Sequence, residues 1–345
     1  MEEGNGEYHG FGRERSNRKQ RLRGGEMTKG DAIVNCAYAA LRECLNLKQR
    51  ERLLVVCDPP CFEVGSAFFE AGNRLCRETV MVQIRPRKEN GNEPPEPTDE
   101  WFGQFEVAVM PTSKSLSHTR ARRNASEKGT RIATLPGITP ETFIRTMNTD
   151  WAQLGTLTRK VAAQLSSARK ITIRTNAGTD FSFETGGRRA KADDGKIGTP
   201  GSFGNLPAGE AYLAPLEGTA EGTLVIDGSF PLVGSLSKPL VMRVRKGEVV
   251  EVSGHPCRRD LNRIFNAHGK AARNIAEFGI GTLDTARVSG NILEDEKVKG
   301  TIHVAVGDNA SMGGGVQVPI HLDGIVVSPS VWLDGALWMS EGVIV

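Results

Sequence analysis

The sequence has no apolar run long enough to cross a membrane, and its first residues lack the apolar core of a signal peptide. Since a membrane-spanning helix needs about 20 predominantly apolar residues, we expect no membrane partner. The six cysteines are scattered, and none is paired at the two-residue spacing of a zinc or redox motif. Disulfide frameworks belong mostly to short secreted chains, so we expect free thiols in a cytoplasmic protein.

The sequence also lacks a strong charge imbalance and a phosphate-binding loop. Its 44 basic and 41 acidic residues leave a net charge of +3 without a concentrated basic face, which argues against a nucleic-acid partner. The first strand that we expect, at 52–57, is followed by Asp58-Pro-Pro rather than by a glycine-rich turn. A dinucleotide or nucleotide site at this strand is therefore excluded.

What is abundant is glycine, with 40 residues, which is typical of numerous tight turns and of an extensive β portion. Residues 1–26 are polar and nearly free of aliphatic side chains, so we expect a disordered extension. Residues 27–166 alternate buried strands with amphipathic helices, which predicts an α/β domain with a mainly parallel sheet. Residues 167–345 consist mostly of short alternating segments and glycine turns, which predicts a predominantly β (α+β) domain.

One helix of the first domain carries a basic cluster. We expect this helix to run from residue 113 to residue 127 and to include Thr119–Arg123. Arginines gathered on a helix most often form a face in contact with solvent, and we interpret this cluster in that way. His118 is assigned to the same solvated face.

The stretch VQVPIHLDGIVVSP near the C-terminus contains His321 and Asp323. If this stretch forms a strand, the two side chains point to the same face, because side chains alternate along a strand. A neutral imidazole beside a carboxylate supplies half of the coordination shell of zinc or a similar ion. The alternative is a hydrogen-bonded pair that only holds two strands in register.

Four other features of the second domain place metal-capable side chains in apolar or glycine-rich surroundings. They are Glu210, Glu277, the acidic run Glu294-Asp295-Glu296, and His303. An isolated carboxylate or imidazole in an apolar segment needs a hydrogen-bonding partner or a metal. Several carboxylates with two or three histidines fit a hydrolytic site with two metal ions, in which the pKa of a bridging water falls to about 7.

The order of these motifs resembles the aminopeptidase T family of metallo-aminopeptidases over residues 168–345. The resemblance is carried by Asn-Leu-Pro-Ala-Gly-Glu210, Glu277 before a glycine turn, Asp295-Glu296, His303-Val-Ala-Val-Gly and His321-Leu-Asp323. It implies a cytoplasmic homodimer that hydrolyses a peptide or small amide bond with two divalent ions per chain, either zinc, cobalt or manganese.

By this resemblance the metal ligands are Glu210, Glu277, His303, His321 and Asp323, and the catalytic carboxylate is Glu296. We expect Glu210, His303 and Asp323 to share one ion, and Glu277 and His321 to hold the other. The sequence departs from the family at two places. Ala310 stands where the family has a tyrosine, and Glu296 lies seven rather than five residues before His303, which leaves Glu294 as an alternative catalytic residue.

The 2,5-dihydroxypyridine dioxygenases resemble the same family and are the main alternative. The resemblance implies a single iron ion held by two histidines and an aspartate, with a histidine at the place of Glu277 and an apolar residue at the place of Glu210. Because this chain has carboxylates at both places, we predict the hydrolase. A non-catalytic relative is the second alternative, and convergence of the predicted ligands would distinguish the enzyme from it.

Overall fold

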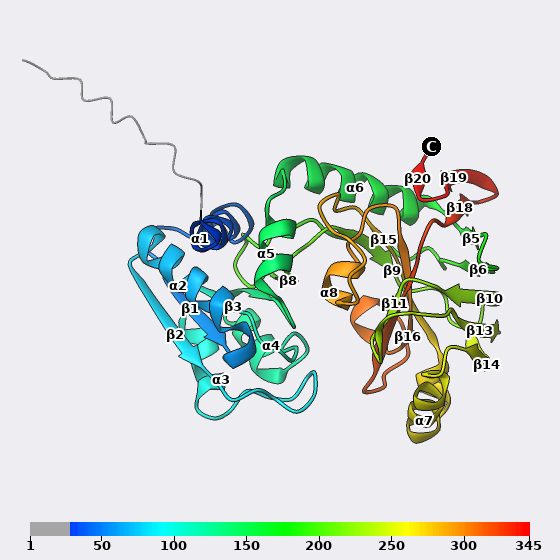
Figure 1. Cartoon of the computed structure of the whole chain (residues 1–345), viewed down its shortest axis with the longest axis horizontal. Helices are drawn as coiled ribbons and strands as arrows, with labels where there is room; N and C mark the ends of the chain where they lie inside the picture. Colours follow the sequence, from blue (N-terminus) through cyan, green and yellow to red (C-terminus); the bar gives the residue numbers. More distant parts are fainter. Residues whose placement is uncertain (1–27) are drawn as a thin grey trace, which may run out of the picture.

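The structure, a computed structural model, describes residues 28–345, so the extension predicted at 1–26 lies outside the described residues. Figure 1 shows an N-terminal part in blue and cyan on one side and a part built mostly of strands on the other. Helix α6 (Trp151–Ser167) connects them and packs along β7 (Lys191–Asp193) and β9 (Glu210–Leu213). Of the helices in this described range, none combines the length and the apolar character that a membrane span requires.

The N-terminal part contains a five-stranded parallel sheet in the order β2-β1-β3-β4-β8. Alternate residues of β1 enter two separate cores. Leu53 and Val55 pack against α1, α2 and α5, whereas Leu54 and Val56 pack on the opposite face with α4. A strand that is buried on both faces has a continuous apolar sequence, which is why the parallel sheet could be predicted.

The strands of this sheet are β1 (Arg52–Cys57), β2 (Glu78–Gln83), β3 (Val107–Met110), β4 (Arg131–Thr134) and β8 (Phe203–Asn205). The helices of this part are α1 (Lys29–Ala39), α2 (Phe62–Leu75), α3 (Thr98–Trp101), α4 (Arg120–Glu127) and α5 (Pro140–Met147).

Strand β8 follows the domain boundary that we predict after residue 166, yet it pairs in parallel with β4 of the first sheet. Thr134 lies opposite Asn205 in this pairing. The chain then enters β9 at Glu210, so the N-terminal sheet anchors the segment that leads to one of the predicted metal ligands. The division into two domains at this boundary stays a prediction.

The helix expected from residue 113 begins only at Arg120, and Thr119 caps its first turn. Ser117, in the preceding loop, places its hydroxyl oxygen 2.7 Å from Thr134 Oγ1 of β4. Serine side chains that bind nearby polar groups compete with helix formation, which accounts for the later start. His118 therefore lies in a loop and not on a helix face.

The C-terminal part has two larger sheets, which are antiparallel throughout. The eight-stranded sheet has the order β14-β13-β10-β6-β5-β18-β19-β20, and the five-stranded sheet has the order β17-β16-β15-β9-β7. The two sheets share one core, in which the ring centroids of Phe183 and Phe278 lie 5.3 Å apart. The predicted fold class, an α/β part with a mainly parallel sheet followed by a β-rich part, is confirmed.

The remaining strands are β5 (Lys170–Arg174), β6 (Asp180–Glu184), β10 (Glu221–Ile226), β11 (Ser229–Phe230), β12 (Gly234–Ser235), β13 (Leu240–Arg245), β14 (Glu248–Gly254), β15 (Ile275–Gly281), β16 (Ile302–Gly307), β17 (His321–Val326), β18 (Ser330–Leu333), β19 (Ala336–Ser340) and β20 (Val343–Ile344). Two helices, α7 (Arg258–His268) and α8 (Ile292–Asp295), interrupt them.

Candidate metal centre

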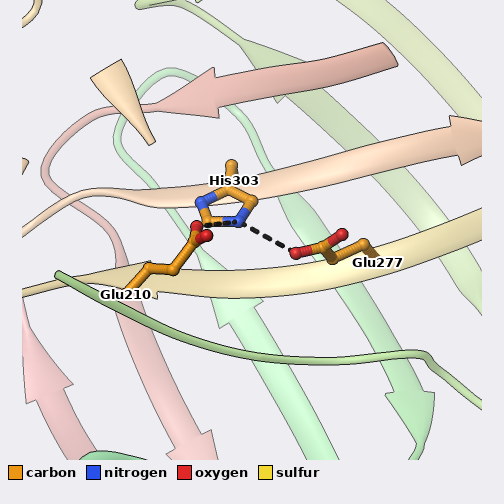
Figure 2. A group of neighbouring side chains, drawn as sticks. All are labelled: Glu210, Glu277 and His303. Atoms are coloured by element: carbon orange, nitrogen blue, oxygen red, sulfur yellow. Dashed lines mark hydrogen bonds and ion pairs between the residues drawn. The ribbon is translucent and has the colours of Figure 1, made fainter. Parts of the chain in front are cut away.

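All the metal ligands that the sequence predicts lie on one face of the antiparallel five-stranded sheet, β17-β16-β15-β9-β7. These are Glu210 of β9, Glu277 of β15, His303 of β16, and His321 and Asp323 of β17. Alternation turns them away from the core, into which neighbours such as Phe278 and Val304 point. Figure 2 shows Glu210 and Glu277 converging on the imidazole of His303.

Small residues between the ligands make room for them. Gly279 lies directly opposite His303, and a Cβ at Gly279 would lie 2.0 Å from His303 Nε2. Ala305 lies between Glu277 and Asp323, its partners on the two neighbouring strands. The glycines after Glu277, which we expected to form a turn, instead continue strand β15. The absence of a side chain at Gly279 leaves the space that the His303 imidazole occupies.

His321, Asp323 and Glu277 form the first of two groups of possible metal ligands. His321 Nε2 lies 3.1 Å from Glu277 Oε2 and 3.3 Å from Asp323 Oδ1. The other ring nitrogen, Nδ1, donates to the backbone carbonyl of Asp308 at 2.8 Å, since a carbonyl oxygen can only accept. A histidine held in this way presents the lone pair of Nε2, the arrangement typical of metal-bound histidines.

Two observations indicate that a cation belongs in this group. Asp323 Oδ1 is buried and has no hydrogen-bond partner among residues 28–345, although His321 lies close to it. Burial lowers the pKa of His321, but Asp323 and Glu277 outweigh this effect and raise the pKa well above its ordinary value. Without a metal, a proton on Nε2 supplies the positive charge that the two carboxylates require.

Glu210, Glu277 and His303 form the second group. His303 Nε2 lies 3.2 Å from Glu210 Oε2 and 3.4 Å from Glu277 Oε1. His303 Nδ1 is buried without a hydrogen-bond partner in the described chain, so no backbone carbonyl holds this ring as Asp308 holds His321. The expected partition put Asp323 with Glu210 and His303, whereas in the structure Asp323 lies with His321 and Glu277. Which residues share an ion stays a prediction.

Lys297 already supplies a positive charge to the second group, and the sequence did not reveal it. Its side chain is 0% exposed, and its ammonium lies 2.5 Å from Glu210 Oε1, 3.2 Å from Glu296 Oε2 and 3.7 Å from Asp193 Oδ2. In the sequence Lys297 is indistinguishable from Lys299, which is exposed. Only the packing around β9 and β15 decides which of the two lysines is buried.

Glu296 borders this group through Lys297. Burial raises the pKa of Glu296 to about 8, and the negative charges of Asp323 and Glu210 add to the effect while Lys297 opposes it. For Glu210 the balance is reversed, because Lys297 and His303 outweigh burial and lower the pKa to about 2. Glu296 is therefore protonated near pH 7, whereas Glu210 is ionised.

Glu294, the alternative for the catalytic role, lies elsewhere. Its carboxylate is fully buried and accepts hydrogen bonds at 2.7 Å to both oxygens from Arg145 Nη2 of α5. Asp295 accepts from Ser229 Oγ at 2.5 Å. Both carboxylates lock α8 to its surroundings, so within the acidic run only Glu296 borders the possible ligands.

The expectation that His118 lies on a helix is wrong, because it lies in the loop before α4, whereas its side chain is exposed to solvent as expected. The loop that carries His118 brings it within electrostatic range of His321 and Asp308 on the opposite part of the molecule. Partial loss of water lowers the pKa of His118, the charges of His321 and Arg122 lower it further, and Asp308 opposes them. We had taken the serines before His118 as the first turn of the helix. They belong to the loop, and the helix begins after Thr119.

Ala310, which stands where the aminopeptidase T family has a tyrosine, lies in an exposed turn after β16. A different tyrosine lies on the face that carries the ligands, because Tyr212 is two residues after Glu210 on β9 and opposite Gly279. Burial and the charges of Glu277 and Glu210 raise the pKa of Tyr212, so its hydroxyl remains protonated.

Comparison with known proteins identifies the family. A family model described as 2,5-dihydroxypyridine 5,6-dioxygenase matches residues 40–345. The chain belongs to this family. A 2,5-dihydroxypyridine 5,6-dioxygenase from Pseudomonas putida is 26% identical over 245 residues, which are 67% of this chain and 69% of the relative.

Two solved structures share the fold of this dioxygenase-family chain. The structure of the 2,5-dihydroxypyridine dioxygenase from Pseudomonas putida KT2440 superposes with a TM-score of 0.78 at 20% identity, covering 92% of this chain and 98% of that one. AmpT from Thermus thermophilus superposes with a TM-score of 0.68 at 16% identity, covering 92% of this chain and 100% of that one. At these identities the likeness shows the fold alone.

These findings correct the prediction of function. The assignment to the aminopeptidase T family, and with it the hydrolase, aminopeptidase and metalloprotease activities, is wrong, because the matching family is that of a dioxygenase. The relationship to the dioxygenases, which we stated as the alternative, is confirmed. The error arose because carboxylates at the places of Glu210 and Glu277 were taken as diagnostic of a hydrolase.

Proposed function

We propose that the protein is a metal-dependent dioxygenase that opens a hydroxylated aromatic ring such as a dihydroxypyridine. The observation that carries the proposal is the convergence of Glu277, His321 and Asp323 in a chain of the dioxygenase family. These three residues would hold one divalent ion. A bound iron(II) ion would supply the one-electron chemistry through which dioxygen reacts with an aromatic ring.

The residues of this group fit a divalent ion. Asp323 Oδ1 is a buried oxygen without a hydrogen-bond partner among the described residues, and His321 Nε2 is oriented by the Asp308 carbonyl. One imidazole with two carboxylates is a donor set that iron(II), manganese(II) and zinc(II) all accept. The set contains one more carboxylate and one fewer histidine than we expected of a dioxygenase, so iron is a proposal that requires metal analysis.

Other residues would prepare the substrate. The lowered pKa of His118 keeps its imidazole neutral near pH 7, so a ring nitrogen can accept the proton of a substrate hydroxyl. Glu296, with a pKa of about 8, holds a proton on its carboxyl group at the same pH and can donate a hydrogen bond. Lys297 holds Glu210 and Glu296 in place.

The test is oxygen uptake by protein loaded anaerobically with iron(II) and supplied with 2,5-dihydroxypyridine. We expect one dioxygen molecule to be consumed for each ring that loses its absorbance, and no uptake by His321→Ala. His255→Ala is the matched control, because His255 lies at the turn before α7, outside both groups of ligands. Ring loss without oxygen uptake, or no reaction with any hydroxypyridine, would contradict the proposal.

We also propose a cytoplasmic location and a homodimer. All six cysteines are free, and burial raises the pKa of Cys57 to about 11 and of Cys61 to about 12, which keeps them as unreactive thiols. Light scattering on the purified protein would test the dimer.

A further inference from the structure

We propose that Glu217 is a positioning residue for the metal centre, because it fixes the loop whose backbone orients the proposed ligand His321. This inference deepens the proposed function and rests on it for the role of His321 as a metal ligand. Its support is a path of contacts that runs from Glu217, in the segment between β9 and β10, through one peptide of the loop to the His321 ring.

The loop between β16 and β17, residues 308–320, carries the group that orients His321. His321 is the first residue of β17 and lies opposite Gly307, the last residue of β16. Its Nδ1 donates to the Asp308 carbonyl at 2.8 Å, so the direction in which Nε2 points depends on that carbonyl. A group that orients a metal ligand is effective only when it is itself held in place.

The Asp308 carbonyl belongs to a planar peptide that is also held through the next residue, Asn309. A planar peptide fixes the carbonyl of one residue relative to the N–H of the next. The N–H of Asn309 donates to the Val316 carbonyl at 3.0 Å, and the side-chain oxygen of Asn309 accepts from the Val316 N–H at 2.9 Å. Whatever holds Asn309 therefore also holds the carbonyl that orients His321.

Glu217 holds the Asn309 side chain from outside the loop. Glu217 Oε1 accepts from Asn309 Nδ2 at 2.8 Å and from the Gly315 N–H at 2.9 Å, so one oxygen joins two arms of the loop. Its other oxygen, Oε2, accepts from Arg188 Nη2 at 2.6 Å, and Arg188 Nη1 donates to the Pro215 carbonyl at 2.5 Å. The carboxylate of Glu217 therefore connects the loop to the segment that follows β9.

The Asn309 amide is closely surrounded as well as hydrogen-bonded. Asn309 is fully buried, and a Cβ at Gly314 would lie 2.0 Å from its Cγ. Burial raises the pKa of Glu217, but the bonds from Arg188, Gly315 and Asn309 outweigh burial and lower the pKa to about 2. Since an ionised carboxylate is a strong acceptor, a charge-assisted hydrogen bond holds the amide on one side and close packing holds it on the other.

Two other kinds of contact also act on the loop. The Asp308 carboxylate accepts from two backbone N–H groups of the loop itself, which fixes the shape of the loop but not its place on the sheet. Lys191 reaches the loop from outside and donates to the Ser311 carbonyl at 2.6 Å, but this lysine is exposed and its bond lies away from the Asp308 peptide. We therefore assign the positioning of that peptide to Glu217.

The test compares Glu217→Ala with Glu217→Gln in the full-length protein. Glu217→Ala removes both bonds to the loop, and the binding of manganese(II) should weaken about tenfold, the lower end of the range for a residue that supports a metal ligand from outside. Glu217→Gln retains an oxygen that accepts from Asn309 and Gly315, so its affinity should stay within about threefold of the wild type. Competition with a chelator measures both affinities.

A spectroscopic measurement separates positioning from a general loss of stability. The visible absorption of protein saturated with cobalt(II) depends on the geometry of the ligands. We expect shifted absorption bands in Glu217→Ala and the bands of the wild type in Glu217→Gln. Asp334→Ala is the matched control, because Asp334 Oδ1 accepts from the N–H groups of Arg169 at 2.9 Å and Lys170 at 2.8 Å in a turn outside the loop. It should lower stability in urea but leave the cobalt spectrum and the affinity for manganese(II) unchanged.

If Glu217→Ala fails to fold, Gly314→Ala replaces it, because the new Cβ displaces the Asn309 side chain while Glu217 stays intact. The cobalt bands should shift in this variant too. Unchanged bands and affinity in the variant that is measured, an equal change in Asp334→Ala, or shifted bands in Glu217→Gln would overturn the inference.

Two further outcomes distinguish this inference from the proposed function. If His321→Ala binds manganese(II) as tightly as the wild type, His321 is not a ligand, and the positioning role falls together with the proposed metal site. Shifted cobalt bands in Glu217→Ala, together with no oxygen uptake by the iron-loaded wild type, would support the positioning role and refute the dioxygenase.

Discussion

The two groups of possible ligands share Glu277 but differ in where their positive charge comes from. In the group with His321 and Asp323, the imidazole is oriented by a backbone carbonyl, and within residues 28–345 the two carboxylates form ion pairs with histidines and with no lysine or arginine. In the group with Glu210 and His303, a fully buried lysine already contacts Glu210. The first group is built to receive a cation, whereas the second contains one.

The difference shows why counting carboxylates was misleading. Two unit positive charges 4 Å apart repel by about 4 kcal/mol at the effective dielectric constant of a protein interior. A metal ion in the second group would have to overcome such a repulsion from Lys297, and an ion in the first group would not. We therefore expect one strongly bound ion per chain, in place of the two that the sequence led us to predict.

The largest effect should come from removing the resident charge of the second group. Lys297→Met leaves Glu210 without its partner in a buried site, and breaking a buried ion pair in this way costs about 3–5 kcal/mol. Urea unfolding of the metal-free protein would measure the loss. Lys299→Met, at the exposed lysine, should change the free energy of unfolding by less than about 0.5 kcal/mol. Similar losses in the two variants would mean that Lys297 carries no special charge balance.

The next largest effect should separate the two histidines. His321→Ala removes a proposed metal ligand. Losing a residue that only hydrogen-bonds to a ligand weakens metal binding by up to about 100-fold. Losing the ligand itself should therefore weaken the binding of manganese(II) by the protein by more than about 100-fold. His303→Ala should weaken the binding of manganese(II) by less than about tenfold, because His303 lies in the group that already contains Lys297. Competition with a chelator measures both affinities. Equal losses would abolish the distinction between the groups.

A smaller effect should follow from filling the space over β15. In Gly279→Ala the new Cβ would lie 2.0 Å from His303 Nε2, so the imidazole must move, at a cost of about 1–3 kcal/mol. The affinity for manganese(II) should stay within about tenfold of the wild type, because His321 and Asp323 are untouched. Thermal unfolding and chelator competition, measured on the same variant, test the two expectations separately. A complete loss of metal would show that His303 is an essential ligand.

The smallest effect concerns Glu296 and depends on pH. Its pKa is raised from 4.5 to about 8, so the folded state holds a proton that the unfolded state releases, and stability falls as the pH rises between these values. Glu296→Gln imitates the protonated form. The metal-free variant should therefore gain stability relative to the wild type across this range, by more than about 1 kcal/mol. Urea unfolding at pH 5 and pH 8 compares them, and a constant difference would show that Glu296 is ionised in the folded state.

Local patterns were sufficient for the fold class and for the side chains of the ligand face. Continuous apolar strands between helices indicated the parallel sheet, because such strands are buried on both faces. The spacing of His321 and Asp323 placed them on one face of a strand, because side chains alternate with a period of two. Both inferences needed only neighbours in the sequence.

Long-range contacts decided what the site can do. Whether Lys297 or Lys299 would be buried depends on segments more than 80 residues apart that meet only in the folded chain. The choice between hydrolase and dioxygenase is of the same kind, since the same carboxylates either bind a second metal or pair with a buried lysine. The sequence by itself determined which side chains share a strand face, and the tertiary structure decided which charges they meet, because electrostatic energy depends on distance in space and not on distance along the chain.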